Sequence, residues 1–313
     1  MSQGLQVLVA LCLLGAACGP DRSVPSRVRM ADQSLAELGA DRGAFREEQP
    51  IRLPAGWAAR ALCLSPRGPL VGADASLWRL TPEARFEKVA DFHEDVVAVA
   101  VGPDGRIWAA GPSTVYRVTE GAAEAVFRPG NARRSDLVSL AAGHDRVWAG
   151  DAGNRRVWIL DGSGALVGSF GPKTKDYPGL VVPSPHLDVA ALTDGLFANV
   201  NPGLRRIELR GPDGRLLRAI GEGGSAVEQF SGCCNPTDIA VLRGNGIATM
   251  EKGLPRIKIY DLEGRMLRLV AGTDAFHPST LGGDLAAAED GRIWFLDRQR
   301  GELRRFAPRE EAK

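Results

Sequence analysis

The chain has 313 residues, of which 44% are hydrophobic and 25% are charged, with 38 glycines and 20 prolines. This hydrophobic content is typical of a folded protein and excludes a mainly disordered chain. The 39 basic and 38 acidic side chains leave a formal net charge of +1. A balance so close to neutral argues against a nucleic-acid binder, which needs a basic excess or a basic face.

The N-terminus carries an apolar run, LQVLVALCLLGAA, over residues 5–17, and Cys18 follows it directly. The run is too short to span a bilayer, which takes about 20 residues, but it suits the core of a secretory signal. The small residues before Cys18 resemble the cleavage site of a bacterial lipoprotein, which implies that residues 1–18 direct export and that Cys18 is lipidated in the cell envelope. The alternatives are ordinary secretion with cleavage nearby and an unprocessed tail that tethers the protein to the membrane. Residues 19–48 are polar and are expected to form a tether between this membrane anchor and the folded domain.

From residue 60 onward, a pattern of short apolar segments separated by Gly-containing turns occurs six times, most clearly over residues 136–171 and 237–272. The third apolar segment of each copy has an equivalent position, and these positions lie about 38 to 50 residues apart: Trp78, Tyr116, Trp158, Glu208, Lys258 and Arg304. Strand-only units of this length are typical of propeller blades. The sequence therefore predicts an all-β protein, a six-bladed β-propeller of four-stranded antiparallel blades over residues 49–308, with a short tail at 309–313.

The last copy shows only three strands, whereas the segment QPIRL at residues 49–53 precedes the first copy. We expect this N-terminal segment to supply the outer strand of the last blade, which would close the ring without an open edge. Trp108, Trp148 and Trp294 occupy matching second strands, so they are expected to pack between blades.

The stretch VWAGDAGNRRV, from Val147 to Val157, resembles the core of an NHL repeat, in which an apolar strand ends in Asp, a turn holds Asn and Arg precedes the next strand. We expect Asp151 to pair with Arg155 or Arg156 across that turn. The resemblance implies a six-bladed propeller. It does not select an activity, because this fold hosts lyases, lactonases and binding modules alike.

Acidic residues begin or precede the first strand in five of the six copies: Asp95, Asp136, Asp188, Asp238 and Asp284. Since the first strand of each propeller blade lines the central channel, we expect a ring of carboxylates at one mouth of this channel. Such a ring would suit a divalent cation such as calcium, with Asp136, Asp188 and Asp238 as candidate ligands. The alternative is that each carboxylate caps backbone N–H groups of its own turn or of a neighbouring blade.

The pair Cys233-Cys234 lies in the segment FSGCCNPT, at residues 230–237, where the chain enters the fifth blade. Two adjacent cysteines in an exported protein predict a vicinal disulfide, with a dithiol or metal-binding thiols as alternatives. Cys63 falls on the inner strand of the first blade and is expected to be a buried core residue.

These observations predict a binding module for an envelope protein or a small-molecule ligand. Its expected contact residues at the channel mouth are Cys233, Cys234, Asn235, Asp238, Asp188 and His186. The alternative is an enzyme, either a metal-dependent lactonase or lyase using the channel carboxylates or a redox component using the cysteine pair. No catalytic residue is assigned, because the sequence has no zinc-type histidine spacing, phosphate loop or triad motif.

Overall fold

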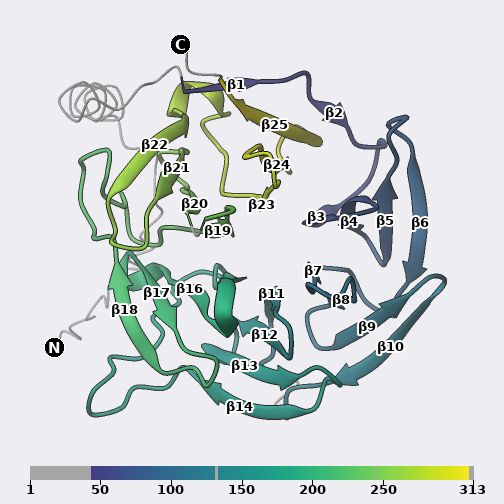
Figure 1. Ribbon diagram of the computed structural model, residues 1–313, viewed down its shortest axis with the longest axis horizontal. Helices are drawn as coiled ribbons and strands as arrows, with labels where there is room; N and C mark the ends of the chain where they lie inside the picture. Colours follow the sequence, from purple (N-terminus) through teal and green to yellow (C-terminus); the bar gives the residue numbers. More distant parts are fainter. Residues whose placement is uncertain (1–43, 131–132, 245, 310–313) are drawn as a thin grey trace, which may run out of the picture.

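The computed structural model describes residues 44–130, 133–244 and 246–309. These residues form six small antiparallel sheets arranged as blades around a central axis (Figure 1). The predicted all-β, six-bladed propeller is therefore confirmed. The predicted lipidation site Cys18, the signal at 1–18 and most of the tether lie outside the described residues. No helix within the described ranges is long and apolar enough to cross a membrane.

Each blade contributes one strand to each of four concentric positions. The inner strands are β3 (Ala59–Ser65), β7 (Ala98–Val101), β11 (Leu137–Ala142), β15 (Val189–Ala191), β19 (Asp238–Val241) and β23 (Asp284–Ala287). The second strands are β4 (Gly68–Ala73), β8 (Ile107–Ala110), β12 (Arg146–Asp151), β16 (Phe197–Asn201), β20 (Ile247–Met250) and β24 (Ile293–Asp297). The third strands are β5 (Ser76–Leu80), β9 (Val115–Thr119), β13 (Arg156–Asp161), β17 (Arg206–Arg210), β21 (Ile257–Tyr260) and β25 (Glu302–Pro308). The outer strands of blades one to five are β6 (Phe86–Asp91), β10 (Ala122–Phe127), β14 (Leu166–Phe170), β18 (Leu216–Ile220) and β22 (Met266–Ala271).

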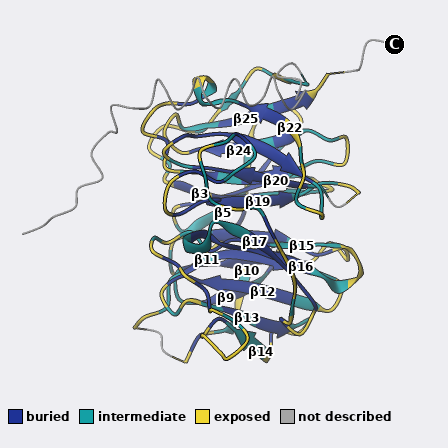
Figure 2. Cartoon of the chain, turned by 90° about the vertical axis from the view of Figure 1, so that its left-hand side faces the viewer, coloured by how far each residue is buried: buried dark blue, intermediate teal, exposed yellow. Residues whose placement is uncertain are grey.

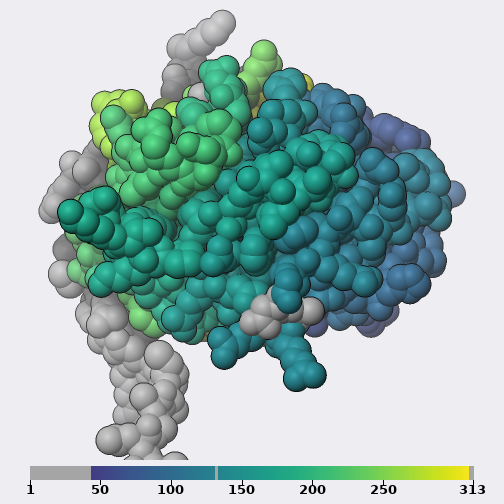
Figure 3. Space-filling model, turned by 90° about the horizontal axis from the view of Figure 1, so that it is seen from below, coloured from purple at the N-terminus to yellow at the C-terminus, as the bar shows by residue number. Residues whose placement is uncertain are grey.

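The burial pattern explains why the second strands read as apolar runs rather than as alternating sequences. Blades pack face to face, so both faces of a second strand are covered: every residue of β16 and β20 is buried. The outer strands are more exposed, as in β10 and β18. Figure 2 shows that the strands are mostly buried, in dark blue, and that exposed residues, in yellow, gather in the loops along the two faces. From the side, successive blades form one packed rim, with the teal third blade beside the blue second blade (Figure 3).

The ring closes through the N-terminal part of the described chain. Strands β1 (Phe45–Glu47) and β2 (Ile51–Arg52) both pair antiparallel with β25. Together they occupy the outer position of the sixth blade, as predicted. Pairing already begins at Phe45, so the polar tether ends before the predicted boundary at residue 48.

The core lies mainly between neighbouring blades. Trp148 on β12 stacks on Phe197 of the next blade, with ring centroids 4.7 Å apart and planes inclined by 23°. Trp108 is buried against residues of the third blade, and Trp294 packs against the first blade. The matching tryptophans therefore pack between blades, as the sequence predicts.

The predicted ion pair of Asp151 is wrong. Its carboxylate accepts bonds from the Asn154 backbone N–H (3.0 Å), the Asn154 side-chain amide (2.8 Å) and the Trp158 indole N–H (3.0 Å). Arg156 instead passes over the Trp158 ring and donates to Ser169 on the outer strand. Neutral donors therefore already hold this carboxylate.

Candidate functional site

A cavity of about 740 Å³ opens at the end of the channel where the inner strands begin. Loops and strand ends of all six blades line it. We call it the mouth cavity. The charged and titratable side chains that line it are Arg60, Asp136, His186, Asp188, Asp238, Lys252 and Arg298.

Three carboxylates at the starts of inner strands join one blade to the next. Asp188 accepts the backbone N–H of Ile239 (2.7 Å), and Asp238 accepts that of Leu285 (2.8 Å). Asp284 accepts the backbone N–H of Leu62 (2.5 Å), which links the sixth blade to the first. These contacts agree with the capping alternative of the sequence analysis, since each carboxylate satisfies a donor on the neighbouring blade.

The same three carboxylates are electrostatically costly. Burial raises the pKa of Asp188 well above its ordinary value, and the charge of Asp284 raises it further. Burial also raises the pKa of Asp238, with added repulsion from Asp188 and Asp284. Burial raises the pKa of Asp284 to about 6. Proton binding is therefore favoured in this group, and its negative charge is reduced relative to three ordinary carboxylates.

Among the described residues, the other two aspartates of the predicted ring accept no backbone N–H of a neighbouring inner strand. Asp95 faces Arg60 at 3.7 Å on an exposed surface. Asp136 lines the mouth cavity, and its pKa is raised by partial burial and by the charge of Asp151. The predicted ring thus separates into three carboxylates that bond to the next blade and two that do not.

The candidate calcium ligands Asp136, Asp188 and Asp238 all line the mouth cavity. Within the described part of the chain, however, no three His, Cys, Asp or Glu side chains are grouped so that they could hold a metal ion. Asp188 and Asp238 each also commit one oxygen to a backbone N–H of the next blade. This donor arrangement does not fit the six to eight oxygen ligands that calcium prefers.

Three basic side chains also line the cavity: Arg60, Lys252 and Arg298. Lys252 Nζ contacts the Ser184 hydroxyl at 2.9 Å, and Arg298 donates to the Arg60 carbonyl at 2.6 Å. His186 lies among them: burial, followed by the charges of Lys252 and Arg298, lowers its pKa to about 4. The imidazole is therefore neutral at physiological pH, and the cavity combines three cations with a neutral histidine.

Long loops ahead of blades four, five and six form much of the cavity wall, and buried ion clusters hold these loops. The clusters centre on the third-strand positions Glu208, Lys258 and Arg304, where the first three blades have aromatic residues. Glu208 contacts Arg206 (2.6 Å) and Arg210, and it accepts a bond from Tyr177 in the preceding loop (2.8 Å). Arg304 contacts the Ala275 carbonyl at 2.9 Å.

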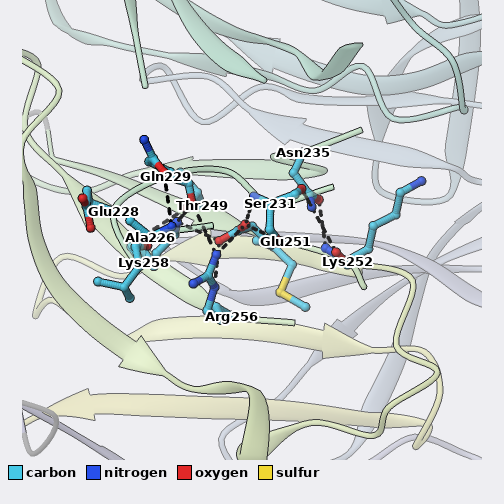
Figure 4. Close-up of polar contacts among 12 residues, drawn as sticks. Ala226, Glu228, Gln229, Ser231, Asn235, Thr249, Glu251, Lys252, Arg256 and Lys258 are labelled. Carbon is cyan, nitrogen blue, oxygen red and sulfur yellow. Dashed lines mark hydrogen bonds and ion pairs between the residues drawn. The ribbon is translucent and has the colours of Figure 1, made fainter. Parts of the chain in front are cut away.

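The fifth-blade cluster is the most buried (Figure 4). Glu251 receives Arg256 at 2.9 Å and Lys258 at 2.7 Å, and all three side chains are at most 3% exposed. Lys258 also donates to the carbonyls of Val227 (2.9 Å) and Gln229 (3.0 Å). The Arg pairing expected for Asp151 is thus found here, where the longer Glu251 reaches both cations and the loop.

The cysteine pair lies beside the mouth cavity rather than in its lining. Cys233 is exposed and Cys234 is buried, and their sulfur atoms are 3.2 Å apart, which is longer than a disulfide bond. Asn235 is buried, and its side-chain amide bonds both backbone groups of Lys252. Its Oδ1 accepts the Lys252 N–H at 2.9 Å, and its Nδ2 donates to the Lys252 carbonyl at 3.0 Å. The vicinal disulfide stays a prediction for the oxidised protein.

The predicted contact residues therefore divide into two groups. His186, Asp188 and Asp238 line the mouth cavity together. Cys233, Cys234 and Asn235 are not part of its lining, and Asn235 bonds the backbone of Lys252, which is. Sequence reasoning missed the cations Arg60, Lys252 and Arg298. Aligning the blades would have found Lys252 and Arg298, because each directly follows an acidic residue, Glu251 just after β20 or Asp297 at the end of β24.

Cys63 packs against the inter-blade core of blades one and two but is half-buried rather than fully buried, and it also lines a pocket formed by the inner strands. Burial raises the pKa of its thiol to about 12. The raised pKa disfavours the thiolate at neutral pH.

Comparison with solved structures supports the fold. The chain is similar to a streptogramin B lyase (TM-score 0.56, 13% identity, 85% of this chain and 98% of that one). It is also similar to a protein of unknown function from Bacteroides thetaiotaomicron (TM-score 0.59, 14% identity, 83% and 72%) and to the WD40 propeller domain of Doa1 (TM-score 0.54, 12% identity, 85% and 97%). No family model and no curated protein sequence matches the chain. At these identities the similarity establishes the propeller fold alone, and the NHL relationship stays a prediction.

Proposed function

We propose that this propeller is a binding module that holds a small anionic ligand, carrying a carboxylate or phosphate group, in the mouth cavity. The observation that carries the proposal is the charge arrangement there. Lys252 and Arg298 are close enough to His186 to lower its pKa, while the neighbouring Asp188 and Asp238 have raised pKa values. The pKa of Asp136, the third carboxylate of the lining, is raised as well. The negative charge that opposes an anion is therefore reduced, and the cations of the cavity can attract one.

The size of the cavity favours a small molecule over a flat protein surface. Its volume of about 740 Å³ lies within the roughly 300–1,000 Å³ of small-molecule sites. The walls supply the mixed lining that such sites use, with Leu137 and Leu281 beside the basic groups. Propellers of similar shape include both WD40 domains and lyases, so the fold accommodates a binding role.

The N-terminal sequence adds a location to this proposal. The apolar run at residues 5–17, followed by Cys18, supports export and attachment to a membrane of the cell envelope through a lipid. The propeller would then present its mouth cavity to solutes outside the cytoplasm.

Titration calorimetry with citrate and inorganic phosphate, and with glycerol as an uncharged control, tests the proposal. We expect the anions to bind and glycerol not to bind. Lys252→Met and Arg298→Gln should each weaken anion binding by about tenfold, because each removes a charged hydrogen-bond donor. Arg85→Gln, on an exposed turn away from the cavity, is the matched control. Equal affinity in the cavity variants and the control would contradict the proposal.

An enzymatic role at the same cavity is the second candidate. One observation favours it: Asp188 and Asp238 have raised pKa values and stand in one cavity with a neutral His186. Such combinations supply acid–base groups in active sites. Asp238→Asn separates the candidates, since it removes a proton donor but keeps the oxygen that accepts the Leu285 N–H. A binding module retains its ligand in this variant, whereas an enzyme binds but no longer turns over.

A further inference from the structure

We propose that Cys233 and Cys234 form a thiol–disulfide exchange site, in which exposed Cys233 attacks a small disulfide and buried Cys234 resolves the product. This role does not depend on the identity of the mouth-cavity ligand. It rests on the different exposure of the two thiols and on the 3.2 Å between their sulfur atoms.

Access decides the order of reaction. Cys233 is exposed. The preceding Gly232 has a φ of +71° and lies in open space, since a Cβ added there would meet only the Asn235 amide, at 3.9 Å. A small disulfide can therefore approach the Cys233 sulfur. Cys234 is only 4% exposed, so a group bonded to its sulfur would have to enter the packed wall. We therefore assign Cys233 as the attacking thiol.

The exchange balances without any other reactant. The Cys233 thiolate attacks one sulfur of the small disulfide, forms a mixed disulfide and releases one small thiol. The Cys234 thiolate then attacks the Cys233 sulfur and releases the second small thiol. One small disulfide is reduced to two thiols, and the two protein thiols, having lost two protons, are joined in an eight-membered ring.

The surrounding contacts transmit this change to the mouth cavity. The Ser231 backbone N–H is bonded to buried Glu251 at 3.0 Å, which fixes the start of the turn (Figure 4). At its other end Asn235 accepts the Lys252 backbone N–H at 2.9 Å, and Lys252 extends to Ser184 at the cavity. Ring closure must bring the sulfurs from 3.2 Å to about 2.05 Å. Asn235 also donates to the Ser231 carbonyl at 2.6 Å, so the turn is held at both ends. Closing the ring between these ends strains the hydrogen bonds that hold it, including the one from the Lys252 N–H to Asn235.

Peptide mass analysis of the full chain after incubation with oxidised glutathione tests the chemistry. Tryptic residues 219–243 contain Cys233 and Cys234 and no other cysteine. In the wild type this peptide should lose two hydrogen masses and carry no glutathione. Cys234→Ser should instead accumulate a glutathione adduct on Cys233, and Cys233→Ser should react at least about tenfold more slowly than Cys234→Ser. The peptide containing Cys63 is the internal control and should stay unmodified.

A stable glutathione adduct in the wild-type peptide, or equal rates in the two serine variants, would overturn the assignment. So would a wild-type peptide that is unmodified in the folded protein but oxidised after denaturation. Amide hydrogen exchange tests the transmission: oxidation should speed exchange at the Lys252 N–H and leave the Leu180 N–H, bonded to Gly171 on another blade, unchanged. Identical exchange at Lys252 in both redox states would contradict the coupling to the cavity.

Discussion

The substitution Glu251→Gln tests the idea that buried charges hold the cavity wall in place. Glu251 is fully buried and contacts Arg256 at 2.9 Å, Lys258 at 2.7 Å and the Ser231 N–H at 3.0 Å. Glutamine keeps the size and one acceptor oxygen but leaves the buried Arg256 without a counter-charge. It also removes the carboxylate that favours the charged form of Lys258, whose pKa burial lowers to about 7. Breaking a buried ion pair from one side costs about 3–5 kcal/mol. We expect the lower end of this range, about 3 kcal/mol, because the amide oxygen still accepts a hydrogen bond.

Urea unfolding followed by tryptophan fluorescence measures this cost. A loss of about 3 kcal/mol corresponds to a midpoint lower by roughly 1–2 M urea. Lys258→Met should cost less, since Glu251 keeps Arg256 as a partner. The exposed Glu263→Gln is the control and should change stability by less than about 0.5 kcal/mol. A loss below about 1 kcal/mol for Glu251→Gln, or an equal loss in the control, would show that these buried charges do not hold the cavity wall in place.

Three further predictions concern the ring itself. Since the pKa of Asp284 is raised to about 6, the folded state binds this proton more tightly than the unfolded state, so stability should fall as pH rises from about 4 to above 6. Asp284→Asn should flatten this pH dependence of stability in urea titrations, and an unchanged slope would contradict the prediction. Phe197→Ala removes the ring stacked on Trp148 and should cost about 3–5 kcal/mol in the same assay; a loss under about 1 kcal/mol would show that this contact does not join the blades. Glu47→Gln weakens the contacts at 2.6 and 2.8 Å to Arg304 and should lower the free energy of unfolding by about 1–3 kcal/mol. Proteolysis near residue 45 should become faster, and an unchanged cleavage rate would argue against closure through β1.

The fold could be predicted from the sequence because a blade is a local unit. Apolar strands and Gly turns recur along the chain, so the number of blades follows from counting copies. Closure followed from the same count, because the last copy lacked a strand that the N-terminal segment could supply, as the pairing of β1 and β2 with β25 confirms. The number of blades depends on neighbouring residues alone, and closure, which joins segments far apart in the sequence, follows once the strands are counted.

The site was only partly predictable because its residues come together from all blades. The sequence placed His186, Asp188 and Asp238 at the mouth, but it could not separate the carboxylates that bind the next blade from those that do not. A shift of a few residues decides this: Asp238 begins its strand and caps Leu285, whereas Asp95 precedes its strand and remains exposed.

The cations were missed for a related reason. Their positions after the second strands hold unlike residues in different blades, such as Pro112, Lys252 and Arg298, so no repeated residue type marks them. The exchange of aromatic anchors for Glu208 and Lys258 is visible in the sequence, but its meaning depends on the long loops that these side chains bind.

A crystallographic screen with small carboxylate, phosphate and uncharged fragments tests the central claim most directly, because it locates bound molecules without assuming a ligand. We expect acidic fragments to collect in the mouth cavity, in contact with Lys252, Arg298 or Arg60, and uncharged fragments not to do so. A cavity that stays without fragments while acidic fragments bind at other surfaces would contradict this claim.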